Sequence, residues 1–145
     1  MRDQRGQIAG LEGLVFGMLL FVFGTLLVVN AWAVVDAKLS ASAAAREATR
    51  AFVEGRVPEE AALAAEAAGV AAFAGYGRSV DRAELRLIEG ELARCSRVVF
   101  EAAYRLPALH IPVLGGLGEG FRVSSRHAEL VDPHRSGLDG EGCGA

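Results

Sequence analysis

The hydrophobic pattern divides the chain into an unbroken apolar run, a helical stretch and an alternating stretch. The apolar run extends from Gly13 to Val35 and contains no charged residue. A helix of about 23 residues is roughly 35 Å long, enough to cross a hydrocarbon core of ~30 Å with some tilt. Trp32 lies near the end of the run, where indole rings favour the membrane interface. The pattern therefore predicts one transmembrane helix over residues 13–35, surrounded by membrane lipid.

The same helix is predicted to continue beyond the apolar run. Residues 36–54 contain no glycine or proline and many alanines, the residue with the highest helix propensity. At about 100° per residue, Asp36, Arg46, Glu47, Arg50 and Glu54 fall within one arc of about 100° and so share one face. We therefore expect one helix from about Leu11 to Glu54, half in lipid and half outside it. The opposite face carries small residues suited to close packing against a sheet: Ala37, Ala41, Ala44, Ala45, Ala48, Ala51 and Phe52.

The rest of the chain predicts a small head. Gly55 is expected to end the long helix, and Pro58 to begin a second helix that reaches about Phe73. Apolar and polar residues then alternate, which predicts strands over residues 83–89, 96–106 and 121–131, with a flexible glycine-rich turn before the last. The predicted fold class is α+β: a long N-terminal transmembrane helix that continues into a soluble head with a second helix and a three-stranded antiparallel sheet.

These elements imply an order of segments along the chain. Residues 1–12 are expected to be a short leader and cytoplasmic segment, and residues 13–35 the transmembrane helix. Residues 36–131 would form an extracytoplasmic head, and residues 132–145 a disordered tail, since they are rich in glycine and charge. The short N-terminal tail favours a cytoplasmic N-terminus, although basic residues flank both ends of the apolar run.

A secretory signal peptide is the alternative to a permanent anchor. Residues 31–33 read Ala-Trp-Ala, the A-x-A form of a cleavage site, and follow an apolar run with arginines before it. The run is longer than the roughly 7 to 15 apolar residues usual in such peptides. The helical pattern also passes through Ala33 without a break. A permanent anchor is therefore favoured, and cleavage after Ala33 stays open.

Charge and motifs bear on the chemistry. The 145 residues carry 15 basic and 18 acidic side chains, a net charge of −3, and the basic residues are scattered. Nucleic acid is therefore not an expected partner. The histidines and cysteines lack metal-site spacing. Ser124, Ser125, His127 and Glu129 are the residue types of a nucleophile and its base, but alternating residues of a strand point to opposite faces and no nucleophile elbow is present. The glycines of residues 115–118 lack the lysine of a phosphate-binding loop. We expect no enzyme activity, cofactor, metal or small-molecule substrate.

The two cysteines, Cys95 and Cys143, offer one covalent link. On the oxidising side of a membrane they can form a disulfide that closes a loop of about 48 residues, worth about 2–4 kcal/mol. The alternative is a pair of free thiols, because Cys143 lies in the expected tail. Both possibilities stay open from the sequence.

The N-terminal segment resembles a known family. Residues 5–12 read Arg-Gly-Gln-Ile-Ala-Gly-Leu-Glu and lead directly into the apolar run. This opening resembles that of TadE-like proteins of the tight-adherence (Flp) pilus assembly machinery, which typically begin R-G-Q-x-x-x-E. Residues 44–51 are similar to the alanine-rich helix of that family, and residues 123–125 and 131–133 to its closing strand. The resemblance implies a pseudopilin-like protein with a pilin-like fold.

The resemblance also implies a processing site. A prepilin peptidase would cut after Gly6, Gln7 would become the first residue, and Glu12 would take the place of the family's glutamate. Five residues separate Gly6 from Glu12 instead of four, and one extra helical residue rotates the carboxylate by about 100°. Such a carboxylate either pairs with the new amino group of a neighbouring subunit or lies solvated among headgroups.

The expected function is structural: a minor pilin or assembly factor of an adhesive pilus, held in the cell membrane by one helix. Its expected partners are lipid, other pilus subunits and a prepilin peptidase. Two alternatives remain, an uncleaved single-pass scaffold and a secreted binding domain released after Ala33. The first residue of the mature protein distinguishes these three, being Gln7, Met1 or Val34 respectively.

Overall fold

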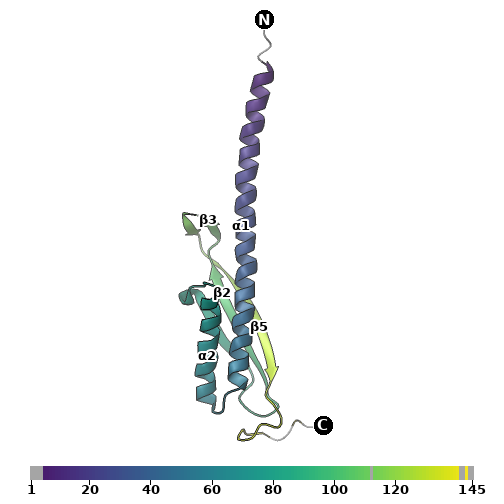
Figure 1. The fold of residues 1–145 in the computed structure, drawn as a ribbon, viewed down its shortest axis with the longest axis vertical. Helices are drawn as coiled ribbons and strands as arrows, with labels where there is room; N and C mark the ends of the chain where they lie inside the picture. The colour runs from purple at the N-terminus through teal and green to yellow at the C-terminus, as the bar shows by residue number, and fades with distance from the viewer. Residues whose placement is uncertain (1–4, 112, 141–142, 144–145) are drawn as a thin grey trace.

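The dominant element of the computed structural model is one straight helix, and the structure describes residues 5–111, 113–140 and 143 (Figure 1). This helix, α1 (Arg5–Val53), is 49 residues long. It passes from the apolar run into the alanine-rich stretch without interruption, because no glycine or proline lies between Gly24 and Gly55. The predicted long helix is confirmed, and it begins at Arg5, earlier than the expected Leu11.

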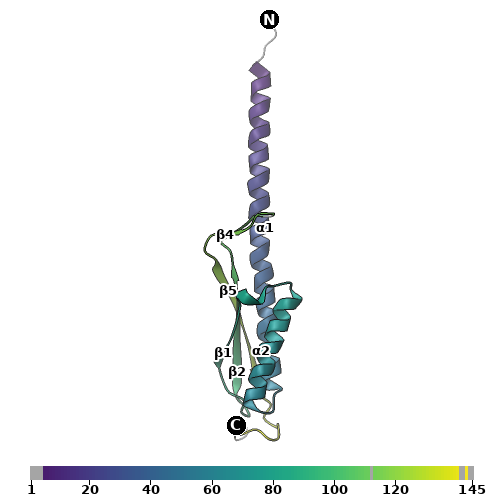
Figure 2. The same cartoon turned by 90° about the vertical axis from the view of Figure 1, so that its left-hand side faces the viewer.

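Helix α2 (Pro58–Gly75) turns back beside the C-terminal half of α1 (Figures 1 and 2). Its proline stands in the first turn, where the missing N–H is not needed, and two glutamates follow at the positive end of the helix dipole. The turn between the helices requires a glycine, since a Cβ at Gly55 would lie 2.3 Å from the Cβ of Ala61. The predicted second helix is therefore confirmed and ends two residues later than Phe73.

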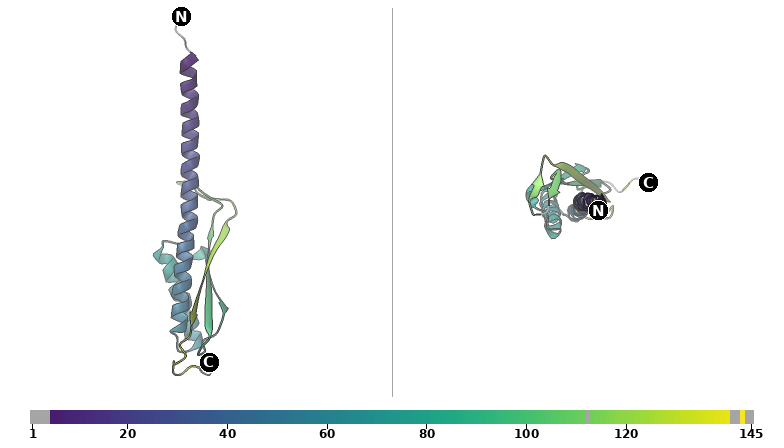
Figure 3. Two further views of the ribbon diagram at one scale, coloured as in Figure 1. Left: turned by 90° about the vertical axis from the view of Figure 1, so that its right-hand side faces the viewer. Right: turned by 90° about the horizontal axis from the view of Figure 1, so that it is seen from above.

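Three longer strands form an antiparallel sheet in the order β1-β2-β5. They are β1 (Ala83–Glu89), β2 (Arg97–Leu106) and β5 (Phe121–Leu130). Both helices lie on the same side of this sheet (Figure 3). A short 3-10 helix, η1 (Val80–Arg82), precedes β1. The predicted α+β class and three-stranded antiparallel sheet are thus confirmed.

A second, smaller sheet lies within the segment expected to be a flexible turn. Strands β3 (Leu109–Ile111) and β4 (Gly115–Leu117) pair antiparallel as a hairpin. Each strand has three residues, too few for an alternating pattern to indicate a strand in the sequence. The β3–β4 hairpin extends beyond the rest of the head and lies beside α1 (Figures 1 and 2).

The core is built on the alanine face of α1. Ala37, Ala41, Ala44 and Ala48 have no exposed surface and face the sheet and α2. Such small side chains let these elements approach the helix closely, and aromatic pairs fill the remaining space. The Phe52 and Phe100 rings meet edge to face at 5.4 Å, and the Phe73 and Tyr104 ring centroids lie 5.9 Å apart. The predicted small-residue stripe thus forms the core.

Residues 132–140 pack against the head, whereas the sequence predicted a disordered tail. Leu138 is buried with Leu92 in one of the two core clusters. The backbone N–H of Arg94 donates to the carbonyl of Asp139 at 2.9 Å. The Arg135 guanidinium donates to the carbonyls of Val53 and Glu54, which the end of α1 leaves without helical partners. A buried leucine, the bonds of Arg135 and a backbone hydrogen bond thus hold a stretch whose composition is typical of disorder.

Candidate functional site

The N-terminal part of α1 is not buried by the head: every residue from Glu12 to Thr25 is exposed, and none from Glu12 to Asp36 is buried. The large apolar side chains there are exposed, including Phe21 (75%), Leu27 (70%) and Trp32 (70%). A Cβ added at Gly13, Gly17 or Gly24 would meet nothing within 4 Å, so the head does not require glycine at these positions. Within the described part of the chain, α1 is the one helix long and apolar enough to cross a membrane. Its exposed surface is the first candidate site.

Two polar side chains interrupt this apolar surface, and both are satisfied. The Thr25 hydroxyl donates to the carbonyl of Phe21 at 2.8 Å, one helical turn back. The Asn30 amide donates in the same way to Leu26 at 2.8 Å. Such bonds remove the cost of placing these groups in an apolar environment. Neither residue therefore conflicts with a helix surrounded by lipid.

Asn30 also joins α1 to the β3–β4 hairpin. Its Nδ2 donates to the carbonyl of His110 at 3.0 Å, and its Oδ1 accepts from the backbone N–H of His110 at 2.7 Å. A carboxamide carries one donor and one acceptor side by side, as the edge of a β-strand does. The sequence marked Asn30 only as a polar residue in the run, because its partner lies 80 positions away.

A cavity of about 670 Å³ lies between the hairpin, α1 and the head. Arg78 lies on its wall and donates to the Asp36 carboxylate and, at 3.4 Å, to the carbonyl of Ala33. The guanidinium carbon stands 5.1 Å from the centre of the Tyr104 ring. Asp36 is the first charged residue after the apolar run. This ion pair therefore fixes the head to α1 at the point where the apolar surface ends.

The sheet face turned away from the helices carries a network of ion pairs. Glu101 of β2 is 7% exposed and accepts from Arg122 at 2.6 Å and from Arg126 at 2.8 Å, both on β5. These two arginines, Arg122 first, hold the pKa of the Glu101 carboxyl below its ordinary value. Glu84 of β1 pairs with Arg105 at 2.6 Å, and its pKa is lowered in the same way. The network links all three strands.

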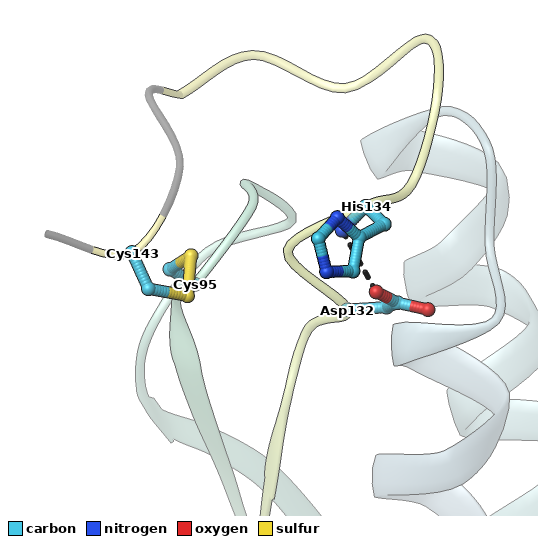
Figure 4. The surroundings of a disulfide bond; sticks show 4 residues. All are labelled: Cys95, Asp132, His134 and Cys143. Carbon is cyan, nitrogen blue, oxygen red and sulfur yellow. Dashed lines mark hydrogen bonds between the residues drawn. A yellow bond between two sulfur atoms is a disulfide. The ribbon is translucent and has the colours of Figure 1, made fainter. Parts of the chain in front are cut away.

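The two cysteines are bonded to each other (Figure 4). Their Cα atoms are 5.2 Å apart, and 48 positions separate them in the sequence. Cys95 precedes β2, and Cys143 follows the packed residues 132–140. Of the two possibilities left open by the sequence, the structure contains the disulfide.

The histidines do not assemble a reactive centre among the described residues. His127 lies 3.2 Å from Glu129. Ser124 is on the opposite face of β5, because side chains alternate along a strand, and Ser125, on the same face, makes no side-chain hydrogen bond to His127 among the described residues. The backbone of His134 donates to Asp132 at 2.8 Å (Figure 4). No group of three or more His, Cys, Asp or Glu side chains suited to a metal ion occurs in the described part of the chain.

The residues of the implied processing site lie at the far end of α1 from the head (Figure 1). The backbone of Gly6 and Gln7 belongs to α1, and the side chain of Gln7 lies outside the described ones. Glu12 is exposed on the helix surface. The head does not reach Glu12, and the Glu12 carboxylate has no ion pair or hydrogen bond with any side chain that the structure describes.

Comparisons of the chain with family models, with curated proteins and with solved structures found no match.

Proposed function

We propose that this protein is a TadE-type pseudopilin or minor pilin, an assembly subunit of a tight-adherence pilus that one membrane helix anchors. The observation that carries the proposal is the division of α1 into two halves. One half exposes large apolar side chains to its surroundings, and the other forms the core of the head. A helix that is apolar all round needs lipid or other helices against it. Pilus subunits use both kinds of contact.

The disulfide supports the orientation of the chain in this proposal. Disulfides persist outside the cytoplasm and are rare within it. The bond between Cys95 and Cys143 therefore favours a head on the outer side of the membrane. The N-terminal segment, with Gly6 and Glu12, would then face the cytoplasm, where a membrane-embedded prepilin peptidase acts.

Glu12 has a role in assembly under this proposal. A carboxylate at the edge of the hydrocarbon costs up to roughly 3 kcal/mol unless it is paired. Cleavage after Gly6 would create an ammonium group on each subunit. Pairing between this group and Glu12 of a neighbour would set the stagger between subunits. A Glu12→Gln variant is therefore expected to insert and be cut but to lose its pilus partners in co-purification, whereas Glu47→Gln, an exposed control in the head half of α1, keeps them.

The first residue of the mature protein tests the proposal directly. In cells that make the pilus, intact mass should show the loss of residues 1–6 and a chain that begins at Gln7. Gly6→Leu should abolish this loss, while Gly13→Leu, where a side chain meets nothing within 4 Å, should be cut as usual.

Two other results would contradict the proposal. A chain that keeps Met1 to Gly6 would favour the uncleaved single-pass scaffold. A chain that begins at Val34 would show a secreted domain released by signal peptidase.

A further inference from the structure

The β3–β4 hairpin exposes apolar side chains that the head does not bury. Val113 is fully exposed, and Leu114 (76%), Leu117 (52%) and Leu109 (40%) are largely so. Residues 107–118 contain no Asp, Glu, Lys or Arg. Contiguous exposed apolar groups on a protein surface mark a contact with another protein or with a membrane. The hairpin therefore has an apolar surrounding that this chain does not supply.

The residue at the tip of the hairpin points to the same conclusion. Val113 has a φ of +76°, a left-handed conformation that glycine adopts freely and that β-branched residues rarely adopt. Glycine or asparagine would form this turn with less strain. Valine adds only one thing there, a fully exposed apolar side chain. A residue that is unfavourable for its backbone conformation and adds no packing within the protein is typical of a functional position.

The two hydrogen bonds between the Asn30 carboxamide and the backbone of His110, here called the Asn30 clamp, fix the position of the hairpin along α1. Asn30 holds both backbone groups of His110 and lies five residues before Val35, the end of the apolar run. At 1.5 Å per residue, this level is about 8 Å inside the end of the run. Figures 1 and 2 show the hairpin beside this part of α1, beyond the rest of the head. The exposed Trp32 lies at the same level of the helix.

We propose that the β3–β4 hairpin is a second membrane contact, which places Val113, Leu114 and Leu117 in the interfacial layer of the leaflet around the outer end of α1. The inference rests on the proposed function, in that it takes residues 13–35 to be the membrane anchor. Continuity favours lipid as the occupant, because the hairpin borders the same helix surface that lipid would cover. The absence of charged residues in the hairpin also suits this depth.

The backbone of the hairpin is suited to this environment. In a membrane, N–H and C=O groups have to be satisfied within the protein. Strands β3 and β4 pair with each other along one edge, and the outer edge of β4, which has no third strand beside it in the described part of the chain, relies on the water and headgroups of the interfacial layer. On the other edge of β3, the backbone N–H and C=O of His110 point away from β4, and the Asn30 carboxamide binds both. Asn30 thus takes the place of a further strand where water is scarce.

Depth-dependent fluorescence quenching tests the proposal on the full-length chain. The chain is reconstituted into phosphatidylcholine vesicles with or without bromine on the acyl chains. Trp32 is the single tryptophan and reports the anchor in the wild type. Leu114→Trp in a Trp32→Phe background reports the hairpin. The matched control is Leu63→Trp in the same background, a leucine 68% exposed on α2.

The proposal requires brominated lipid to quench tryptophan at positions 32 and 114 by at least about half and to leave position 63 unchanged. Quenching at position 32 without quenching at 114 overturns the hairpin contact and leaves the anchor intact. Emission at 114 that is blue-shifted but not quenched shows that a second copy covers the hairpin, and likewise overturns it. Absence of quenching at both positions removes the anchor itself, and with it the proposed function.

Discussion

The two halves of α1 share one backbone and differ in the size of their apolar side chains. The N-terminal half carries leucine, phenylalanine and valine, and these are exposed. The half inside the head carries mainly alanine, and its alanines are buried against the sheet and α2. Large apolar groups suit a fluid surrounding, which adapts to any shape, whereas alanine lets rigid elements approach closely. The size of the apolar residues, more than their number, distinguishes the exposed half of α1 from the half that packs in the head.

The largest expected effect follows from placing a charge in the exposed half. Phe23→Arg puts a guanidinium near the middle of the apolar run, at a cost of about 3 kcal/mol for insertion. We expect membrane fractionation to show reduced recovery of this variant. Leu63→Arg, an equally exposed position on α2, should be recovered as the wild type is. If Phe23→Arg were recovered in the membrane fraction as fully as the wild type, the exposed half of α1 would not be a membrane anchor.

Loss of the disulfide is expected to have the next largest effect, and only on the head. Cys143→Ser should lower the free energy of unfolding by about 2–4 kcal/mol, because the unfolded chain is no longer cross-linked. Thermal unfolding of the full chain in detergent measures this, and reductant should bring the wild type to the same stability. Two thiols open to alkylation before reduction, in protein taken from oxidising conditions, would refute the bond.

The packing of the buried half is tested by enlarging one alanine. Ala44 has no exposed surface, so Ala44→Leu should destabilise the head by about 1–3 kcal/mol through overpacking. The matched change in the other half, Leu20→Ala, removes a 59% exposed side chain and should leave unfolding of the head unchanged. If Leu20→Ala destabilised the head as much, the apolar half would be packing against the protein itself.

Most of the fold was predictable because its signals are local. The apolar run, the alanine stripe and the alternating strands each show within a window of a few residues, and the structure has the corresponding helices and sheet. The β3–β4 hairpin, the Asn30 clamp and the packed residues 132–140 were not predicted. The strands of the hairpin are too short to show an alternating pattern. The other two depend on contacts between residues distant in sequence, such as Asn30 with His110 or Arg135 with Val53. Single-sequence periodicity carries no information about such pairs.

The smallest expected effect is on the pH dependence of stability, through the ion pairs of Glu101 on the sheet face turned away from the helices. The pKa of Glu101 is lowered in the folded protein by Arg122 and then by Arg126. A lowered folded pKa means that this stabilisation is present above the unfolded value of about 4.3 and is lost as pH falls through the folded value. Glu101→Gln should therefore cost about 1 kcal/mol at neutral pH. The difference from the wild type should shrink below about pH 4.

Unfolding across pH 2 to 7 measures this difference, and Glu91→Gln, at an exposed carboxylate, is the control. A difference between Glu101→Gln and the wild type that stayed constant with pH would show that the charge of Glu101 does not stabilise the head. The half of α1 in the apolar run should be insensitive to this change, because the network joins only the strands.

The unbroken stretch of α1 between Gly24 and Gly55 has a mechanical consequence. With no glycine or proline to act as a hinge between Thr25 and Glu54, a push or pull that reaches Thr25 is transmitted to the head with little bending. The Asn30 clamp and the ion pair of Arg78 with Asp36 brace the head against the same rod. A force applied along α1 at the level of Thr25 would therefore raise or lower the whole head by an equal distance.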